Sequence, residues 1–321
     1  MSYIKRASRV LYLSLTLGAT LAACTAAPEQ TVSPWAAPAL STAATWSAWS
    51  SAVPLSELNT PGATEGCPNV VRSGQVLYFA SNRPGGYGAL DLYVSYWESS
   101  AKQWGPALNL GPEINTAWNE QCPLVLQSGR RLVFVSNRPG GVGGLDLWIT
   151  RQPNLRDAVS WETPSNLTAA NSSLNDFGPG SYEENGRTVL YFNSNRLGGA
   201  GQQDIYVSTE QRDDSWSTAV PAMGLNTALQ EEFPALTGNG LEIFFASNRP
   251  GTFGGLDLWH ATRASTAAAW TTPVNLGPLV NGPLAEGRSS VSWNGTTLIF
   301  HSNRAGSVDL FETTRSRSGP H

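Results

Sequence analysis

The sequence predicts an all-β protein, a five-bladed β-propeller built from four-stranded blades. A segment of about 55 residues recurs five times along the chain. Each copy holds four short strand-like runs, which is the number of strands in a propeller blade. The last copy lacks its fourth run, and a matching run, Trp49 to Leu58, stands ahead of the first copy. An N-terminal strand can therefore complete the last blade and close the ring, which removes an open sheet edge.

The most regular motif is Ser-Asn-Arg, which follows an apolar run and precedes a Gly-rich loop. Its serines are Ser81, Ser136, Ser194, Ser247 and Ser302. Asn and Gly accept positive φ, so the motif predicts a turn between two strands. The next run opens with Asp and carries an aromatic residue, and a later run follows a Trp. We expect most of these rings to pack between neighbouring blades.

The arginine of each motif and the Asp that opens the next run bracket one loop between antiparallel strands. Hairpin closure brings them together, so we expect five repeat pairs: Arg83 with Asp91, Arg138 with Asp146, Arg196 with Asp204, Arg249 with Asp257, and Arg304 with Asp309. Because residues present in every repeat chiefly maintain the repeat, a structural ion pair is favoured over a ring of ligand-binding arginines.

An acidic residue precedes the first run of every unit. These candidate channel-mouth acids are Glu65, Glu120, Asp176, Glu231 and Glu286. If they begin the inner strands, they lie near one mouth of the central channel, where like charges repel unless they are paired. We expect each to be tied to a nearby arginine or backbone N–H. The alternatives are a cation site or paired carboxylates for glycoside hydrolysis.

Cys67 and Cys122 occupy the same repeat position in adjacent units, where the other units carry Gly178, Phe233 and Arg288. An oxidising compartment allows a disulfide, provided that the two Cα atoms lie within about 7 Å. The sequence leaves open whether the bond forms. These two thiols, with only three histidines in the whole chain, do not make a metal site. We therefore expect no metal and no cofactor, although the acids leave room for a channel-bound cation.

The N-terminus resembles a lipoprotein signal peptide, with a basic start, a short apolar stretch and small residues ahead of Cys24. Acylation of Cys24 would anchor the protein on a membrane. The predicted order is a signal peptide (1–24), a flexible Ala/Pro/Ser/Thr tether (25–45), the propeller (46–315) and a disordered tail (316–321). Without Asp after Cys24, we expect the outer membrane, on its periplasmic or its surface face.

Composition excludes some function classes. Charged residues make up 14% of the chain and the net charge is −4, so no basic surface for nucleic acid is expected. The sequence contains no G-x-S-x-G, H-E-x-x-H or P-loop motif. On these grounds we predict a protein that is not an enzyme.

The unit of apolar run, Ser-Asn-Arg, Gly-rich loop and Asp-Leu-Tyr or Asp-Leu-Trp resembles the TolB-like, WD-like propeller repeat of bacterial envelope proteins. This resemblance implies an all-β propeller without catalysis that serves protein interaction at the cell envelope. We expect a monomer whose propeller binds an envelope protein or a cell-wall component. The alternative is a glycan-binding or glycoside-hydrolysing five-bladed propeller with carboxylates in its central channel. Fold alone does not decide between the two.

Overall fold

The computed structural model describes residues 45–154 and 159–318 of the 321-residue chain. The predicted signal peptide, its lipidation site Cys24 and nearly all of the predicted tether lie outside the described residues. Within the described residues all regular structure is β-strand. None of them belongs to a helix that is long and apolar enough to cross a membrane.

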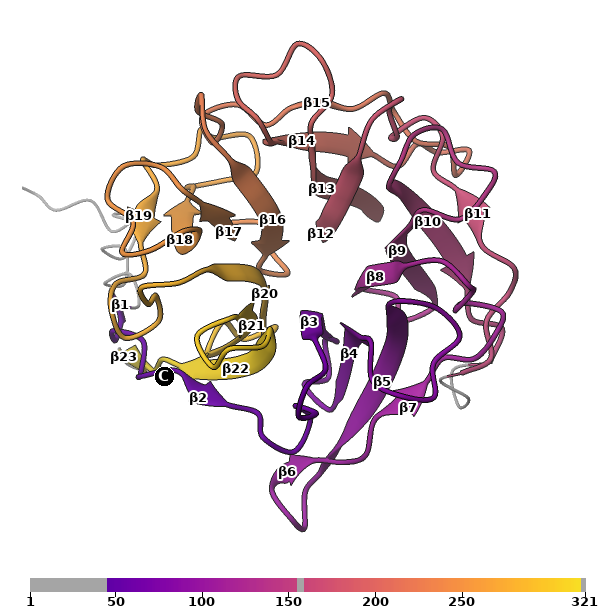
Figure 1. Ribbon diagram of the computed structural model, residues 1–321. Helices are drawn as coiled ribbons and strands as arrows, with labels where there is room; N and C mark the ends of the chain where they lie inside the picture. Colours follow the sequence, from indigo (N-terminus) through magenta and orange to yellow (C-terminus); the bar gives the residue numbers. More distant parts are fainter. Residues whose placement is uncertain (1–44, 155–158, 319–321) are drawn as a thin grey trace, which may run out of the picture. The chain divides into compact units, whose positions relative to one another are not determined.

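Five sheets stand around a central channel in chain order (Figure 1), which confirms the predicted five-bladed propeller. Blade A contains β3 (Glu65–Val70), β4 (Val76–Ser81), β5 (Asp91–Glu98), β6 (Gln103–Trp104) and β7 (Leu108–Asn109). Blade B contains β8 (Glu120–Val125), β9 (Arg131–Ser136), β10 (Asp146–Arg151) and β11 (Ser165–Asn166). Blade C contains β12 (Asp176–Glu184), β13 (Arg187–Ser194), β14 (Asp204–Thr209) and β15 (Val220–Pro221).

Blade D contains β16 (Glu231–Leu236), β17 (Glu242–Ser247), β18 (Asp257–Thr262) and β19 (Val274–Asn275). Blade E contains β20 (Glu286–Val291), β21 (Thr297–Ser302), β22 (Asp309–Thr314) and β2 (Val53–Pro54). Every pairing between neighbouring strands of a blade is antiparallel, and the first strand of each blade lies nearest the channel (Figure 1).

The N-terminal segment closes the ring as predicted. Strand β2 pairs with β22, with Val53 opposite Glu312. Just after it, Leu58 is 1% exposed and packs in the cluster between blades E and A. A further pair lies outside the blades, where β1 (Thr45–Trp46) joins β23 (Arg317–Ser318). The segment predicted to be a disordered tail therefore begins with a short strand.

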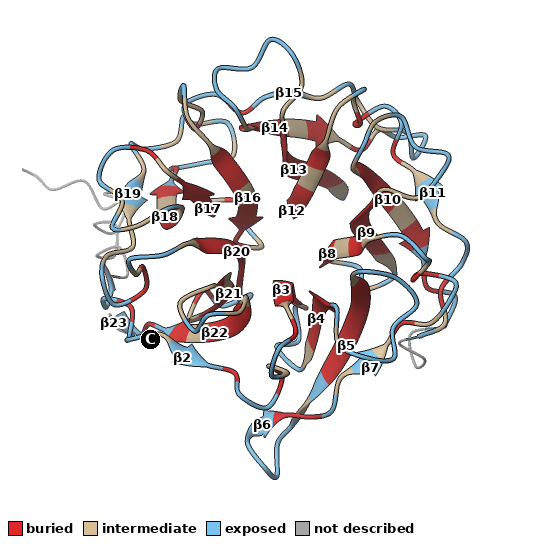
Figure 2. Cartoon of the chain, in the orientation of Figure 1, coloured by how far each residue is buried: buried red, intermediate tan, exposed pale blue. Residues whose placement is uncertain are grey.

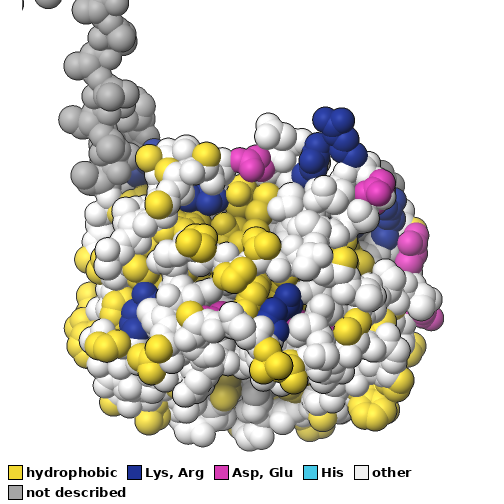
Figure 3. All heavy atoms as spheres, turned by 90° about the horizontal axis from the view of Figure 1, so that it is seen from above, with side chains coloured by type: hydrophobic (Ala, Val, Ile, Leu, Met, Phe, Trp, Pro, Cys, Tyr) yellow, Lys and Arg dark blue, Asp and Glu magenta, His cyan; other side chains and the backbone are white. Residues whose placement is uncertain are grey.

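The hydrophobic core lies between the blades. The second and third strands are buried along most of their length (Figure 2), because each sheet is covered on both faces by its neighbours. Phe79, Phe134, Phe192, Phe245 and Phe300 are each fully buried. On the face in Figure 3, hydrophobic side chains are scattered over the surface, with separate Lys, Arg, Asp and Glu side chains between them.

Candidate functional site

The five predicted channel-mouth acids do begin the inner strands, but they do not face a ligand. Each one is fully buried and forms an ion pair with the arginine of its own blade, at 2.6–3.2 Å. In four of them the motif serine also donates a hydrogen bond to the carboxylate, as Ser81 does to Glu65 at 2.8 Å. Ion pairs and hydrogen bonds within each blade occupy these carboxylates, so they do not form a free catalytic pair.

The predicted repeat pairs named the wrong partner for each motif arginine. Arg83, Arg138, Arg196, Arg249 and Arg304 bind the inner-strand acids and stack on aromatic rings, and none forms an ion pair with Asp91, Asp146, Asp204, Asp257 or Asp309 among the described residues. Asp91 instead accepts hydrogen bonds from the backbone N–H groups of Tyr87 and Gly88 and from the Asn109 amide. The loop N–H groups satisfy the carboxylate of Asp91, so the arginine is free to pair with the acid of the inner strand.

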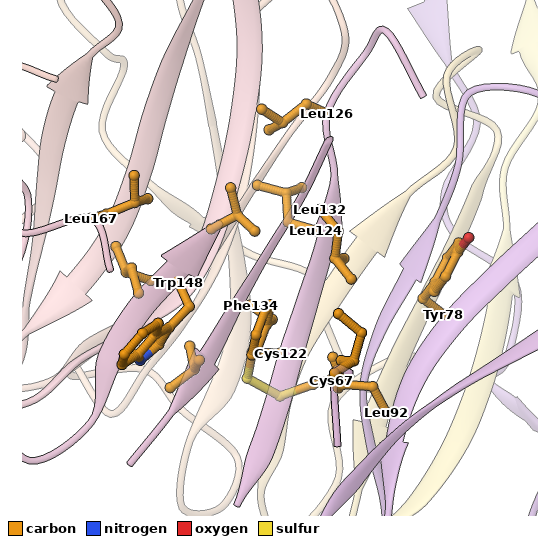
Figure 4. Packing of buried hydrophobic residues seen from close by; sticks show 14 of the residues in the cluster. Cys67, Tyr78, Leu92, Cys122, Leu124, Leu126, Leu132, Phe134, Trp148 and Leu167 are labelled. Atoms are coloured by element: carbon orange, nitrogen blue, oxygen red, sulfur yellow. A yellow bond between two sulfur atoms is a disulfide. The ribbon is translucent and has the colours of Figure 1, made fainter. Parts of the chain in front are cut away.

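Cys67 and Cys122 are joined by a disulfide between the inner strands of blades A and B, with Cα atoms 4.5 Å apart (Figure 4). Both residues lie in a bulge of the inner strand and have left-handed φ, at 52° and 48°. Gly178 and Phe233 take the same conformation in blades C and D. In blade E that position is held by Arg288, which does not adopt it, so one inner strand breaks the repeat.

A cavity of about 490 Å³, here called the axial cavity, lies where the inner strands end, at the opposite end of these strands from the five acids. All five blades contribute to its wall. The lining residues include Arg72, Gln127, Arg288, Ser289 and Trp293. Neither Asp nor Glu is among the lining residues, so the predicted acids do not reach this cavity.

Turns from four blades form the rim of the axial cavity. The Gln127 side chain donates a hydrogen bond to the carbonyl oxygen of Gly238 across the mouth, at 2.9 Å. Trp293 packs against Gly238, where an added Cβ would lie only 2.0 Å from the indole ring. The Arg72 guanidinium stacks 4.2 Å from the centre of that ring. Trp293 remains 41% exposed, which leaves part of the ring free for a ligand.

A second pocket of about 370 Å³, here called the A/E groove, runs between blades A and E. It shares Val70, Arg72, Ser73 and Trp293 with the axial cavity. Its wall adds Trp97 and Trp104, whose rings meet edge to face at 5.4 Å. The buried indole Nε1 of Trp104 has no hydrogen-bond partner among the described residues.

One carboxylate, Glu312, lines the A/E groove. Burial raises its pKa, and the charge of Glu57 raises it further. Glu57 is exposed and accepts a hydrogen bond from the backbone N–H of Trp104 at 3.3 Å, so it lies against the groove wall. Glu57 is not one of the residues that line the groove, and its charge acts on Glu312 from beside it.

Arg288 has the least usual environment of any charged side chain in the axial cavity. It is 1% exposed and donates hydrogen bonds to the carbonyl oxygens of Pro179 and, at 3.4 Å, Pro123. No ion pair neutralises it among the described residues, and burial lowers its pKa to about 9. Burial and the nearby charge of Arg288 also lower the pKa of His301 to about 4.

Glu232, beside Glu231 on β16, predicts a pH dependence of stability. It is 9% exposed, and burial raises its pKa from 4.5 to about 7. The folded protein therefore holds this proton to higher pH than the unfolded chain does. This titration alone should lower stability by about 3 kcal/mol as pH rises from 4.5 to 7. His301, whose pKa is lowered to about 4 in the folded protein, raises stability over the same range. The difference between the wild-type protein and a Glu232 variant therefore isolates the effect of Glu232.

Urea unfolding at several pH values measures this effect, and the Glu232→Gln variant is the control. The variant should lack this part of the pH dependence. An unchanged slope between pH 4.5 and 7 in Glu232→Gln would place the titrating group elsewhere.

Sequence reasoning missed the A/E groove and the role of Arg288. The groove joins residues from the two ends of the chain, and no short motif contains them. Arg288 did leave a signal: in the other four units the equivalent residue is followed by Pro, whereas Arg288 is followed by Ser289. A ligand site usually departs from repeat symmetry, so this departure is the sequence signal that sets Arg288 apart from the repeat residues.

No group of three or more His, Cys, Asp or Glu side chains in the described part of the chain is placed to hold a metal ion. No protein-family model matches the sequence. The curated proteins also contain no match.

Solved structures do resemble the fold. A thermostable family-43 glycoside hydrolase is 14% identical with a TM-score of 0.56, over 81% of this chain and 92% of that one. An α-L-arabinofuranosidase from Podospora anserina, solved with cellotriose, is 12% identical with a TM-score of 0.55, over 85% and 97%. An endo-arabinase from Bacteroides thetaiotaomicron is 14% identical with a TM-score of 0.57, over 83% and 97%. At these identities the likeness establishes the shared propeller fold.

These structures correct three predictions. The resemblance to TolB-like repeat proteins was wrong, because the similar structures are five-bladed glycoside hydrolases. The prediction of a non-catalytic protein that binds an envelope or cell-wall partner is overturned by the same structures. The expectation of no enzyme, which followed from the absence of short catalytic motifs, is overturned as well. The predicted alternative, a glycan-active propeller, is the one that the similar structures support.

Proposed function

We propose that the protein is a glycoside hydrolase that holds its glycan in the A/E groove. The observation that carries the proposal is a groove lined by three tryptophans and one carboxylate, Glu312. Indole rings offer flat apolar faces with a polar N–H at one edge, which suits the faces and hydroxyl groups of sugar rings.

The roles that hydrolysis needs are assigned to Glu312, which lines the groove, and to Glu57, which lies beside it. The raised pKa of Glu312 keeps its proton available, so Glu312 serves as the general acid that protonates the leaving oxygen. Glu57, exposed beside Trp104, serves as the second carboxylate. With Glu312 as the acid, hydrolysis should decline as pH rises through its pKa.

The test is a panel of pentose and hexose polysaccharides, assayed for newly formed reducing ends. Arabinan comes first on the panel because the similar structures include an arabinofuranosidase and an endo-arabinase. Glu312→Gln should lower the rate roughly 10²–10⁴-fold, the usual contribution of a general acid, while glycan binding remains. Glu113→Gln, at an exposed site in a blade A turn, is the matched control.

Two results would contradict the proposal. One is the absence of any hydrolysis by the wild-type protein across the panel. The other is equal rates in the wild-type protein and Glu312→Gln, since the carboxylate in the groove would then take no part.

A further inference from the structure

Arg288 lines the axial cavity and carries a positive charge that no ion pair among the described residues neutralises. Its only hydrogen-bond partners among the described residues are the two carbonyl oxygens of Pro179 and Pro123. A guanidinium stays protonated in proteins, and a buried charge is costly unless an opposite charge compensates it. Carbonyl dipoles compensate part of the charge, and an anion in the cavity would compensate the rest.

Unused donors gather at the same place. The guanidinium has five N–H groups, and its Nε makes no hydrogen bond among the described residues. The next residue, Ser289, also lines the cavity, and its buried hydroxyl has no partner either. Charged donors grouped in this way suit an oxyanion, and an arginine suits a planar carboxylate best because it can donate two parallel hydrogen bonds.

The rest of the cavity wall agrees with an anionic ligand. A second arginine, Arg72, stands at the rim over Trp293, and no carboxylate lines the cavity. A volume of about 490 Å³ lies in the range of small-molecule sites. Arg72 and Trp293 belong to both the axial cavity and the A/E groove, so a glycan bound in the groove can extend into the cavity.

We propose that the axial cavity is a subsite for the carboxylate of a uronic acid residue, with Arg288 as its ion-pair partner and Ser289 as an additional donor. The substrate class is therefore an acidic, uronate-bearing glycan. This inference rests on the proposed function, and it names the kind of glycan that the groove and cavity together accept. A sulfate or phosphate ion shares the oxyanion chemistry, and the experiment separates it from a uronate.

The experiment compares the affinities of the full-length protein for trigalacturonate and for the neutral galactotriose of the same linkage, by calorimetry. We expect the wild-type protein to bind the acidic trisaccharide at least tenfold more tightly, and Arg288→Met to lose that preference. Equal affinities in the wild-type protein, or an undiminished preference in Arg288→Met, would overturn the proposal. Inorganic phosphate that competes as strongly as galacturonate would overturn the assignment to a uronate.

Two further variants cover the case in which Arg288→Met does not fold. Ser289→Ala removes one donor without changing the charge, and it should reduce the preference several-fold. Arg288→Lys keeps the charge but cannot bind a carboxylate through two parallel hydrogen bonds, and it should retain only part of the preference. An unchanged preference in both variants would contradict the subsite.

The failure of this inference is distinct from the failure of the proposed function. Glu312-dependent hydrolysis of neutral glycans without a preference for acidic ones would overturn the uronate subsite and leave the hydrolase. A preference for trigalacturonate that depends on Arg288, with no hydrolysis of any glycan, would overturn the hydrolase and leave the subsite.

Discussion

Substitution of Glu231 by Ala is expected to destabilise the protein by about 3–5 kcal/mol, the usual cost of breaking a buried ion pair. Glu231 is fully buried and accepts hydrogen bonds from the Thr227 backbone and hydroxyl, from Ser247 and from Arg249, the last at 3.0 Å. The substitution leaves Arg249, itself 8% exposed, without its counter-charge. Equilibrium urea unfolding, followed by tryptophan fluorescence, measures the loss.

Two variants make this result specific to the ion pair. Glu113→Ala, at an exposed position, should change stability by less than about 0.5 kcal/mol. The double variant Glu231→Ala with Arg249→Met removes both charges and should recover part of the loss. A loss below about 1 kcal/mol for Glu231→Ala would mean that this acid is not a structural residue, which would reopen its candidacy as a ligand-facing carboxylate.

Removal of the disulfide is the second large effect. Cys67 and Cys122 are 55 residues apart in sequence. The chain-entropy model gives roughly 4 kcal/mol for a cross-link that closes a loop of this length. The double variant Cys67→Ser with Cys122→Ser should lose about that much stability, because the unfolded chain regains the freedom that the bond removed.

A reducing agent provides the control for the disulfide. It should lower the urea midpoint of the wild-type protein toward that of the double variant, and it should leave the variant unchanged. A wild-type midpoint that does not respond to the reducing agent under denaturing conditions would contradict a structural disulfide between blades A and B.

The fold could be predicted because each blade repeats the same local pattern. Five copies of Ser-Asn-Arg with matching flanking runs specify the strands, and the run ahead of the first copy specifies the closure of blade E by β2. The ion-pair partner of each motif arginine could not be predicted in the same way. Two carboxylates flank every motif arginine along the chain, and sequence distance favoured the loop Asp. In three dimensions the loop N–H groups already satisfy Asp91, so Glu65 is the ion-pair partner of Arg83.

The repeat pattern could not predict the candidate site, for a different reason. The A/E groove combines Trp104 of the first blade with Trp293 and Glu312 of the last, and only ring closure makes these blades neighbours. The five acids are site candidates in the sequence because they recur in every unit, yet residues that recur in every unit usually have a structural role. Arg288 is the opposite case: it departs from the repeat, and it lines the axial cavity.

The central claim is that one acidic glycan occupies the A/E groove and the axial cavity together. The most direct measurement is a crystal structure of the Glu312→Gln variant with trigalacturonate bound. We expect a sugar ring against Trp293 and a carboxylate in contact with Arg288 and Ser289. A trisaccharide bound at the other end of the channel, near the strand starts at Glu65 and Glu120, with the axial cavity free of sugar, would contradict it.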